Sequence, residues 1–167
     1  MSLRLMAPLR VVALSFLLVT VIAGGIRADA DPLSVKLMLL QRRLELLETA
    51  FAPKTYREVV EKWAEGVKSR NGAVQFAVLS PELRDQLQHQ FEELMWVTGT
   101  SSPWVEQYSI TSEQDLGETT RRFAVQFQLA TSTGPAGEHT VELVVSKSSD
   151  QYYISKITTA IDGLFPH

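Results

Sequence analysis

The sequence predicts an α+β domain in which helices precede an antiparallel β-sheet and cover one of its faces. Between residues 31 and 96, apolar residues recur every three or four positions, and capping residues precede several of these runs, as in amphipathic helices. From Trp104 onward, apolar and polar residues alternate instead, and short turns separate the alternating runs. Such runs are typical of strands, and short turns require antiparallel pairing. Helices followed by such a meander indicate an α+β fold.

The first thirty residues have the pattern of a secretory signal. Met1–Arg10 contains two arginines and no acidic residue, and Val11–Gly25 is a run of apolar and small residues without a charge. Ala28-Asp29-Ala30 matches the pattern of a signal peptidase site, which predicts cleavage after Ala30. The alternative is an uncleaved anchor, which would be the one expected membrane contact. In both cases we expect residues 1–30 to export the chain, either as a secreted protein or on the outer face of the cytoplasmic membrane.

Composition excludes several classes of function. Cleavage after Ala30 would remove three of the 16 basic and one of the 19 acidic residues, leaving 13 against 18 and a formal net charge of −5. This acidic balance, without a basic run, argues against nucleic acid as a partner. The absence of cysteine excludes disulfides and thiol chemistry. No metal or cofactor is predicted, because the sequence has no glycine-rich phosphate loop and its three histidines share no close spacing: His89, His139 and His167.

Residues 31–52 are predicted to form an amphipathic, leucine-rich helix. Its large apolar residues follow a 4-3-4-3-4 spacing, which is a heptad seam. The simpler interpretation is that the helix packs this seam on its own domain. The alternative is that two copies pair through it as a homodimer near the membrane, although about three heptads is close to the minimum length. The seam comprises Leu33, Leu37, Leu40, Leu44, Leu47 and Phe51.

Three more helices are predicted before the sheet. Thr55 and Glu58 form a capping box that begins the first, and Asn71-Gly72 is expected to end it, because glycine tolerates the left-handed conformation. Residues 73–79 are expected to form a short buried helix. Ser80-Pro81-Glu82 begins the third, because serine caps, proline suits the first turn and glutamate faces the positive end of the dipole. The expected buried stripe of this helix is Leu83, Leu87, Phe91 and Leu94.

Four strands are predicted to follow the helices. Turn signals separate them at residues 115–117, 134–137 and 148–150. One face of the second and third strands is apolar through its middle, so this face is expected to form the core: Phe123, Val125, Phe127 and Leu129, and Val141, Leu143 and Val145. The predicted strands are residues 104–112, 119–131, 138–147 and 151–161.

The order of these elements, together with two segments, resembles the nuclear transport factor 2-like superfamily, whose cystatin-like domains are cone-shaped α+β folds. The resemblance covers residues 53–163. Two segments are similar to parts of uncharacterised exported proteins of Gram-positive bacteria: RNGAVQFAVLSPELR and WVTGTSSPWVEQY. It implies that the helices pack on a curved antiparallel sheet, with a pocket at the concave face. The superfamily includes ketosteroid isomerases and dehydratases alongside noncatalytic binding modules, so the fold does not settle function.

The wall of this expected pocket is apolar except at Glu106 in the first strand. Glu142 is expected to face solvent, and His139 is expected to be exposed at a turn. In the first strand, Trp104, Glu106 and Tyr108 share one face, which would place a carboxylate between two aromatic rings. An inward Glu106 would be desolvated and could act as an acid or a base. The candidate pocket residues are Trp63, Trp104, Glu106, Tyr108, Phe123 and Phe127.

The favoured hypothesis is a noncatalytic exported module that binds a partner protein, an envelope component or a small apolar ligand. It is motivated by an inner sheet face almost without ionisable groups in a domain that is expected to be exported. A first alternative is a cofactor-free enzyme, isomerase- or hydrolase-like, that uses Glu106. A second alternative is a self-assembling unit in which the Leu33–Phe51 helix pairs two copies.

Overall fold

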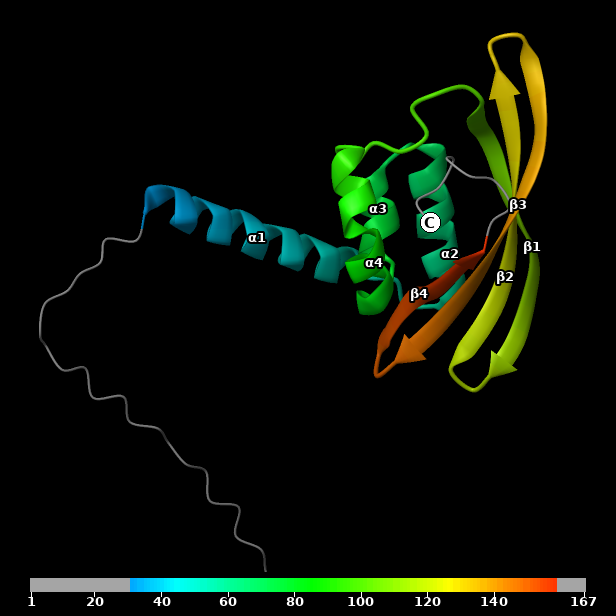
Figure 1. The fold of residues 1–167 in the computed structure, drawn as a ribbon. Helices are drawn as coiled ribbons and strands as arrows, with labels where there is room; N and C mark the ends of the chain where they lie inside the picture. The colour runs from blue at the N-terminus through cyan, green and yellow to red at the C-terminus, as the bar shows by residue number, and fades with distance from the viewer. Residues whose placement is uncertain (1–30, 159–167) are drawn as a thin grey trace, which may run out of the picture.

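The computed structural model describes residues 31–158 (Figure 1). The predicted signal or anchor, and the last residues of the predicted domain, lie outside this range. The described residues form four helices and one four-stranded antiparallel sheet, which confirms the predicted α+β class. Within residues 31–158, no helix is long and apolar enough to cross a membrane.

Each helix begins at a residue whose side chain caps it. In every case the capping oxygen accepts a hydrogen bond from an amide in the first turn. The predicted capping box is partly correct: Thr55 caps as expected, whereas the carboxylate of Glu58 accepts from the amide of Lys54, at 2.6 Å. The helices are α1 (Pro32–Phe51, capped by Asp31), α2 (Tyr56–Lys68, by Thr55), α3 (Gly72–Ala77, by Asn71) and α4 (Pro81–Glu93, by Ser80).

Gly72 begins α3 instead of ending α2 in a left-handed conformation, so that detail of the prediction is wrong. Arg70 has the positive φ, at 59°. Gly72 is needed for a close approach, because its amide donates to the Trp96 carbonyl at 2.9 Å. A Cβ at this position would lie 2.9 Å from both Phe91 Cδ1 and the Trp96 oxygen. Met95 and Trp96 have φ values of 49° and 61°, so a strained turn provides this contact.

The four strands pair in the order β1-β2-β3-β4, and each neighbouring pair is antiparallel. This meander is as predicted, but the turn expected at residues 134–137 lies within β3, and the chain reverses at residues 132–133. Gly134 and Gly137 have φ values of 130° and 100°, which glycine adopts without strain, so the strand continues through them. The strands are β1 (Trp104–Gly117), β2 (Thr120–Thr131), β3 (Gly134–Ser148) and β4 (Gln151–Thr158).

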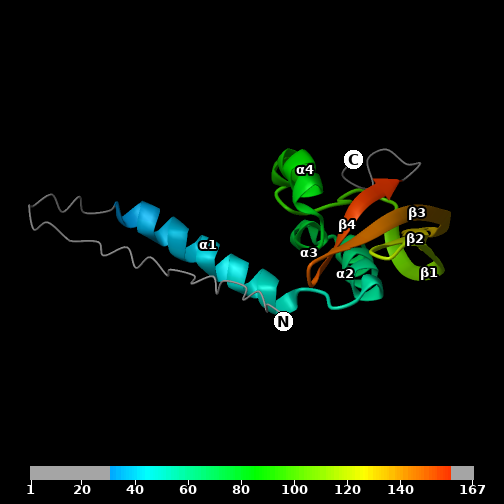
Figure 2. The same cartoon turned by 90° about the horizontal axis from the view of Figure 1, so that it is seen from below.

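The core forms where α2 packs on the inner face of the sheet (Figure 2). Trp63 of α2 and Phe127 of β2 meet there, with ring centroids 6.0 Å apart. The two middle strands bury the apolar residues of the predicted register, which confirms the predicted inner face. The buried residues of α2, β2 and β3 include Val59, Val60, Trp63, Ala64, Val67, Phe123, Val125, Phe127, Leu129, Val141, Leu143 and Val145.

The segment between α3 and α4 covers the outer edge of β4. The Ser80 amide donates to the Ile154 carbonyl, and the Ile154 amide donates to the Val78 carbonyl, each at 2.8 Å. Leu79 thereby forms a parallel bridge with β4. These bonds tie the helical layer to the sheet. Leu94 is exposed, contrary to prediction, because α4 ends one residue earlier.

α1 projects away from the rest of the structure (Figures 1 and 2). None of its residues is buried, and its seam side chains are between 45% exposed, at Leu47, and 68% exposed, at Phe51. The favoured prediction, that this helix packs its seam on its own domain, is therefore wrong. The physical reason is that α2 already occupies the inner face of the sheet.

We expect Gly72→Ala to lower the free energy of unfolding by about 1–3 kcal/mol, because the new methyl group must displace Phe91 or the Trp96 backbone. Urea denaturation of the exported protein measures this loss. The matched control is Gly117→Ala, where an added Cβ meets nothing within 4 Å and the change should stay within about 0.5 kcal/mol. Equal losses in the two variants would contradict the assigned contact.

Candidate interaction surface

The predicted pocket between the helices and the sheet is filled by side chains. Trp63 is 1% exposed, and Phe123 and Phe127 are fully buried in the same cluster. The structure therefore places these three candidates in the core. None of the six candidate pocket residues lines either of two surface grooves that lie beside α1.

A bulge in β1 separates Glu106 from its predicted face. The residues on either side of it pair with consecutive residues of β2, so Glu106 is the extra residue. Val105 and Tyr108 pack against the core, whereas Glu106 is exposed. The expectation that Glu106 shares a desolvated face with two aromatic rings is therefore wrong. Faces assigned from the alternation of residues in a strand are wrong beyond a bulge, because one inserted residue reverses the side of every later side chain.

Trp104 and Tyr108 lie at the margin of the core. Trp104 is exposed, and the Tyr108 ring is 6.3 Å from that of Phe127. The Tyr108 hydroxyl donates to the Glu61 carbonyl of α2 at 3.5 Å. Burial, together with the nearby carboxylates of Glu65 and Glu61, raises the pKa of this hydroxyl. It consequently stays protonated and acts as a hydrogen-bond donor between sheet and helix.

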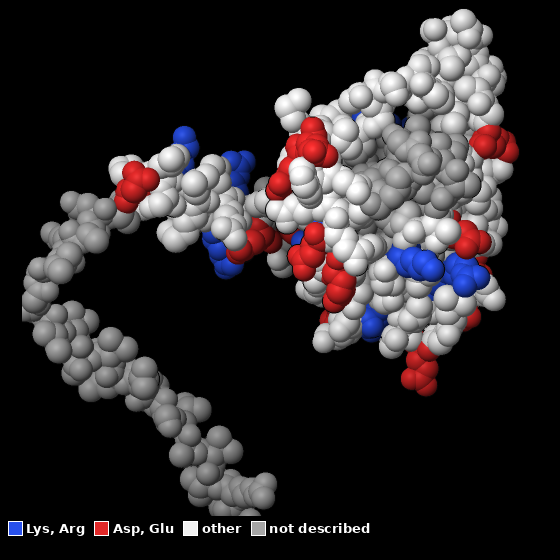
Figure 3. Space-filling view, viewed as in Figure 1, with Lys and Arg blue, Asp and Glu red and all other residues white. Residues whose placement is uncertain are grey.

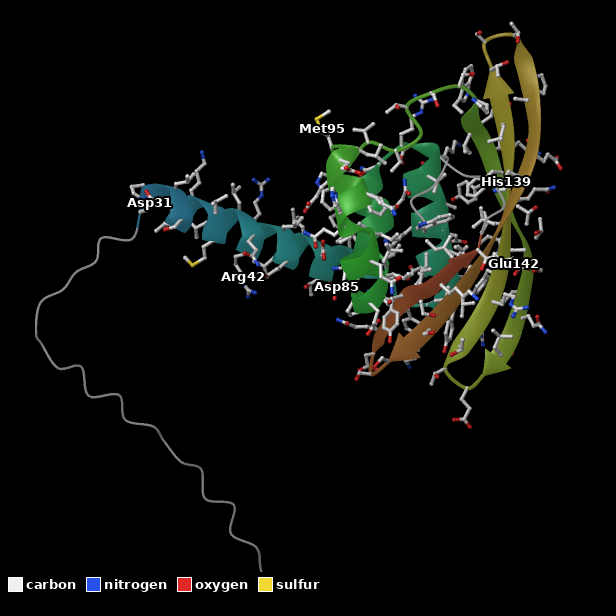
Figure 4. All side chains as sticks on the ribbon, viewed as in Figure 1. Asp31, Arg42, Asp85, Met95, His139 and Glu142 are labelled. Carbon is white, nitrogen blue, oxygen red and sulfur yellow. The ribbon has the colours of Figure 1, made fainter. Side chains whose placement is uncertain are left out.

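His139 is buried in the sheet, which corrects the expectation of an exposed imidazole at a turn. It lies opposite Phe127 of β2 and is 7% exposed. The earlier reversal of the chain explains the difference, since β3 already begins at Gly134. Burial lowers the pKa of the imidazole below its usual 6.5. Glu142 faces solvent on the same strand, as predicted (Figure 4).

The seam of α1 is an exposed apolar stripe outside the core. Charged side chains on this helix leave uncharged surface between them (Figure 3). By the helical period, a second and shorter apolar stripe lies on the side away from the seam. This second stripe contains Val35, Leu39 and Leu46, all exposed.

An apolar groove of about 550 Å³ lies where α1 meets α3, and we call it the α1–α3 groove. One wall is the C-terminal half of the seam, with Leu44, Leu47 and Phe51. The opposite wall is formed by α3 and by Trp96, which follows α4. The other lining residues are Glu48, Ala52, Pro53, Lys62, Asn71, Ala73, Val74, Phe76, Ala77 and Val78.

Aromatic packing holds the Trp96 wall in place. The indole stacks on Phe91, with ring centroids 5.8 Å apart and planes 18° apart. It also meets Phe76 edge-on, at 5.1 Å. The two rings fix the indole in one position, so this wall of the groove is preformed.

An ion pair joins α1 to the domain beside the groove. Arg84 of α4 contacts the Glu48 carboxylate at 3.1 Å, with both side chains 30% exposed. The same guanidinium donates to the carbonyls of Leu79 and Ala77 and lies 5.4 Å above the Phe76 ring. Because Arg84 is held by the domain, it positions the C-terminal end of α1.

A second groove, of about 450 Å³, lies on the other side of this ion pair, between α1, α4 and β4. Its lining includes Glu45, Asp85 and Asp150, but within residues 31–158 no group of side chains has the arrangement of a metal site. The contrast between the grooves indicates what each can do. The α1–α3 groove suits apolar side chains, whereas the second presents charges to solvent.

The positions of Val74 and Trp96 in a groove were not predicted from the sequence. The available signal was the AVQFAVL run, in which Gln75 is the one polar residue, so the pattern alone does not show which side chains face outward. The polar Gln75 points inward, where its amide nitrogen donates to the Gly66 carbonyl at 3.1 Å and to Thr98 Oγ1 at 2.7 Å. Val74 is consequently exposed. This orientation of α3, with Gln75 inward and Val74 outward, depends on contacts with residues distant in the sequence.

We expect Glu106→Gln to change the free energy of unfolding by less than about 0.5 kcal/mol, because the carboxylate is exposed. Phe127→Ala, in the same sheet, should cost about 3–5 kcal/mol. Chemical denaturation of both variants makes the comparison. A large loss in the Glu106 variant would restore a buried role for this carboxylate.

We expect acidification below about pH 6.5 to destabilise the protein through His139. The folded state binds the proton more weakly than the unfolded chain, because burial lowers the folded pKa. Stability is therefore lost as the pH falls from 6.5 toward the folded pKa. The measurement is the unfolding free energy across this range, and its fall should be smaller in His139→Gln. An equal fall in His139→Gln would contradict the assignment of this pH dependence to His139.

No protein-family model matches the chain, and no curated protein matches it. Among solved structures, the chain is similar to the intermembrane space region of the chloroplast protein ARC6, with a TM-score of 0.44 and 13% sequence identity. The match covers 64% of this chain and 97% of that one. A likeness at this level carries no information about family or function, so the resemblance to the nuclear transport factor 2-like superfamily stays a prediction.

Proposed function

We propose that the chain is an exported, noncatalytic interaction module that assembles by pairing two copies through α1. The observation that carries the proposal is the α1 seam, whose six large apolar side chains have heptad spacing and are not buried. Exposed apolar surface on this scale is uncommon in a soluble monomer and marks an interaction site. A heptad seam is complementary to a second copy of itself.

Charges beside the seam favour a parallel pair. Lys36 and Arg43 flank the seam on one side, and Gln41 and Glu48 flank it on the other. In a parallel pair, opposite flanks face each other, which places Arg43 against the partner subunit's Glu48. Within one chain, Glu48 also contacts Arg84 through one carboxylate oxygen. In an antiparallel pair, like flanks meet and arginine faces arginine. Coulomb attraction therefore favours the parallel arrangement.

Export through residues 1–30 fits this arrangement. If the segment stays uncleaved, two copies would leave the outer face of the membrane in the same direction, with their α1 helices side by side. Confinement raises the effective concentration of the helices, which favours pairing through a seam of only about three heptads. Residues 53–163 would then be displayed as a nuclear transport factor 2-like domain at the cell envelope.

We expect Leu40→Ser with Leu44→Ser to convert the dimer to a monomer, because two apolar layers of the seam are lost. Native mass spectrometry of the full chain, expressed with its own N-terminal segment and purified from exported material, reads the stoichiometry. The matched control is Leu39→Ser with Leu46→Ser, which changes equally exposed leucines away from the seam and should remain dimeric. A monomeric parent, or a control that also dissociates, would refute pairing through this seam.

A further inference from the structure

We infer that the paired interface extends beyond the two helices: the partner subunit's Leu47 and Phe51 pack into the α1–α3 groove, against Val74 and Trp96. This inference rests on the proposed pairing of α1 and adds a contact between one copy's helix and the other copy's domain. Such a contact would set the orientation of both domains, which a coiled coil alone leaves to the short connection between α1 and α2.

The groove is a continuation of the seam. Leu44, Leu47 and Phe51 belong to the seam and also form one wall of the groove. A helix that packs along the seam of α1 therefore reaches the groove at the end of α1. With the opposite wall formed by α3, that helix would contact α1 and the domain at once. Val74, exposed on this wall, would be covered by it.

Parallel pairing decides which part of the partner enters the groove. In a parallel pair, residues at equal heights along the two helices meet. The end of α1 lies at the groove, so the partner subunit's last turn, with Leu47 and Phe51, arrives there. An antiparallel pair would bring the partner subunit's Leu33 and Leu37 instead.

The charge of the groove suits the end of a helix. The C-terminus of an α-helix carries a partial negative charge, and the last turn of α1 contains no basic residue to offset it. Two charged residues line the groove: Glu48, which is paired with Arg84, and Lys62 of α2. A partner helix that ends in the groove would place its terminal carbonyl groups near this ammonium group.

The strained turn after α4 supports the Trp96 wall. Met95 and Trp96 both have positive φ, a conformation that costs energy for residues with a side chain and often occurs at binding sites. The turn directs Met95 into solvent, where it is 81% exposed (Figure 4). The same turn holds the indole of Trp96 on Phe91, at the groove.

Pairwise cysteine cross-linking tests the contact directly, because the chain contains no cysteine of its own. Full chains carrying Val74→Cys are mixed, after reversible dissociation, with full chains carrying Leu47→Cys, and a mild oxidant is added. Each chain has one cysteine, so any disulfide that joins positions 47 and 74 is intermolecular. We expect peptide mapping to find this disulfide at a yield about tenfold above that from Leu46→Cys chains, since Leu46 lies away from the seam.

Each outcome decides between alternatives. Equal yields from Leu47→Cys and Leu46→Cys would indicate random collision and overturn the inference. A higher yield from Leu37→Cys would indicate an antiparallel pair and would also overturn it. A dimeric parent without the 47–74 disulfide leaves the proposed pairing intact and removes the groove contact. A monomeric parent removes both.

A substitution within the groove gives a second, independent reading. We expect Val74→Asp to raise the dimer dissociation constant about tenfold, because it places an unpaired charge in an apolar contact. The matched control is Leu116→Asp, at a similarly exposed position in β1 outside the groove, which should leave the constant unchanged. An unchanged dissociation constant in the Val74 variant would overturn the inference. So would a reproducible extra mass that binds the parent dimer and is lost in that variant.

Discussion

The packing of α2 against the inner face of the sheet decides where this protein can contact anything else. Trp63 and Phe127 meet at the centre of this layer, and the inward residues of β2 and β3 surround them. A sheet face filled in this way turns the expected pocket of the fold into core. The apolar surface available to a partner therefore lies outside the core of the described chain, and most of its large exposed apolar side chains belong to α1.

Polar contacts set the position of α1 relative to the domain, whereas exposed apolar side chains give α1 its capacity to bind a partner. The pair between Arg84 and Glu48 is partly exposed, so it contributes little free energy and mainly fixes geometry. Beside it, the α1 wall of the α1–α3 groove stays exposed, whereas Phe76 and Trp96 of the opposite wall pack against the core. The monomer thus holds the seam beside a wall that its own core supports, and it leaves the seam unburied.

Local rules predicted the elements well, and distant contacts account for what they missed. Ser80 and Thr55 cap helices as expected because capping involves residues three positions apart, and the period of two identified the buried face of β2 and β3. Glu106 was placed on the wrong face because a bulge depends on the pairing of two strands. The α1–α3 groove joins residues that no local pattern connects, so only the assembled fold reveals it.

The stability of α1 as a helix argues for a partner more strongly than its exposed leucines alone. Most helical stability in proteins comes from the packing of an apolar face and not from the intrinsic propensity of the residues. α1 spans 20 residues and buries none of them within its own chain. Its Asp31 cap and its ion pair with Arg84 contribute at the two ends only. The proposed pairing would bury the apolar face in the middle of this helix, couple the folding of α1 to assembly and make the helix itself depend on protein concentration.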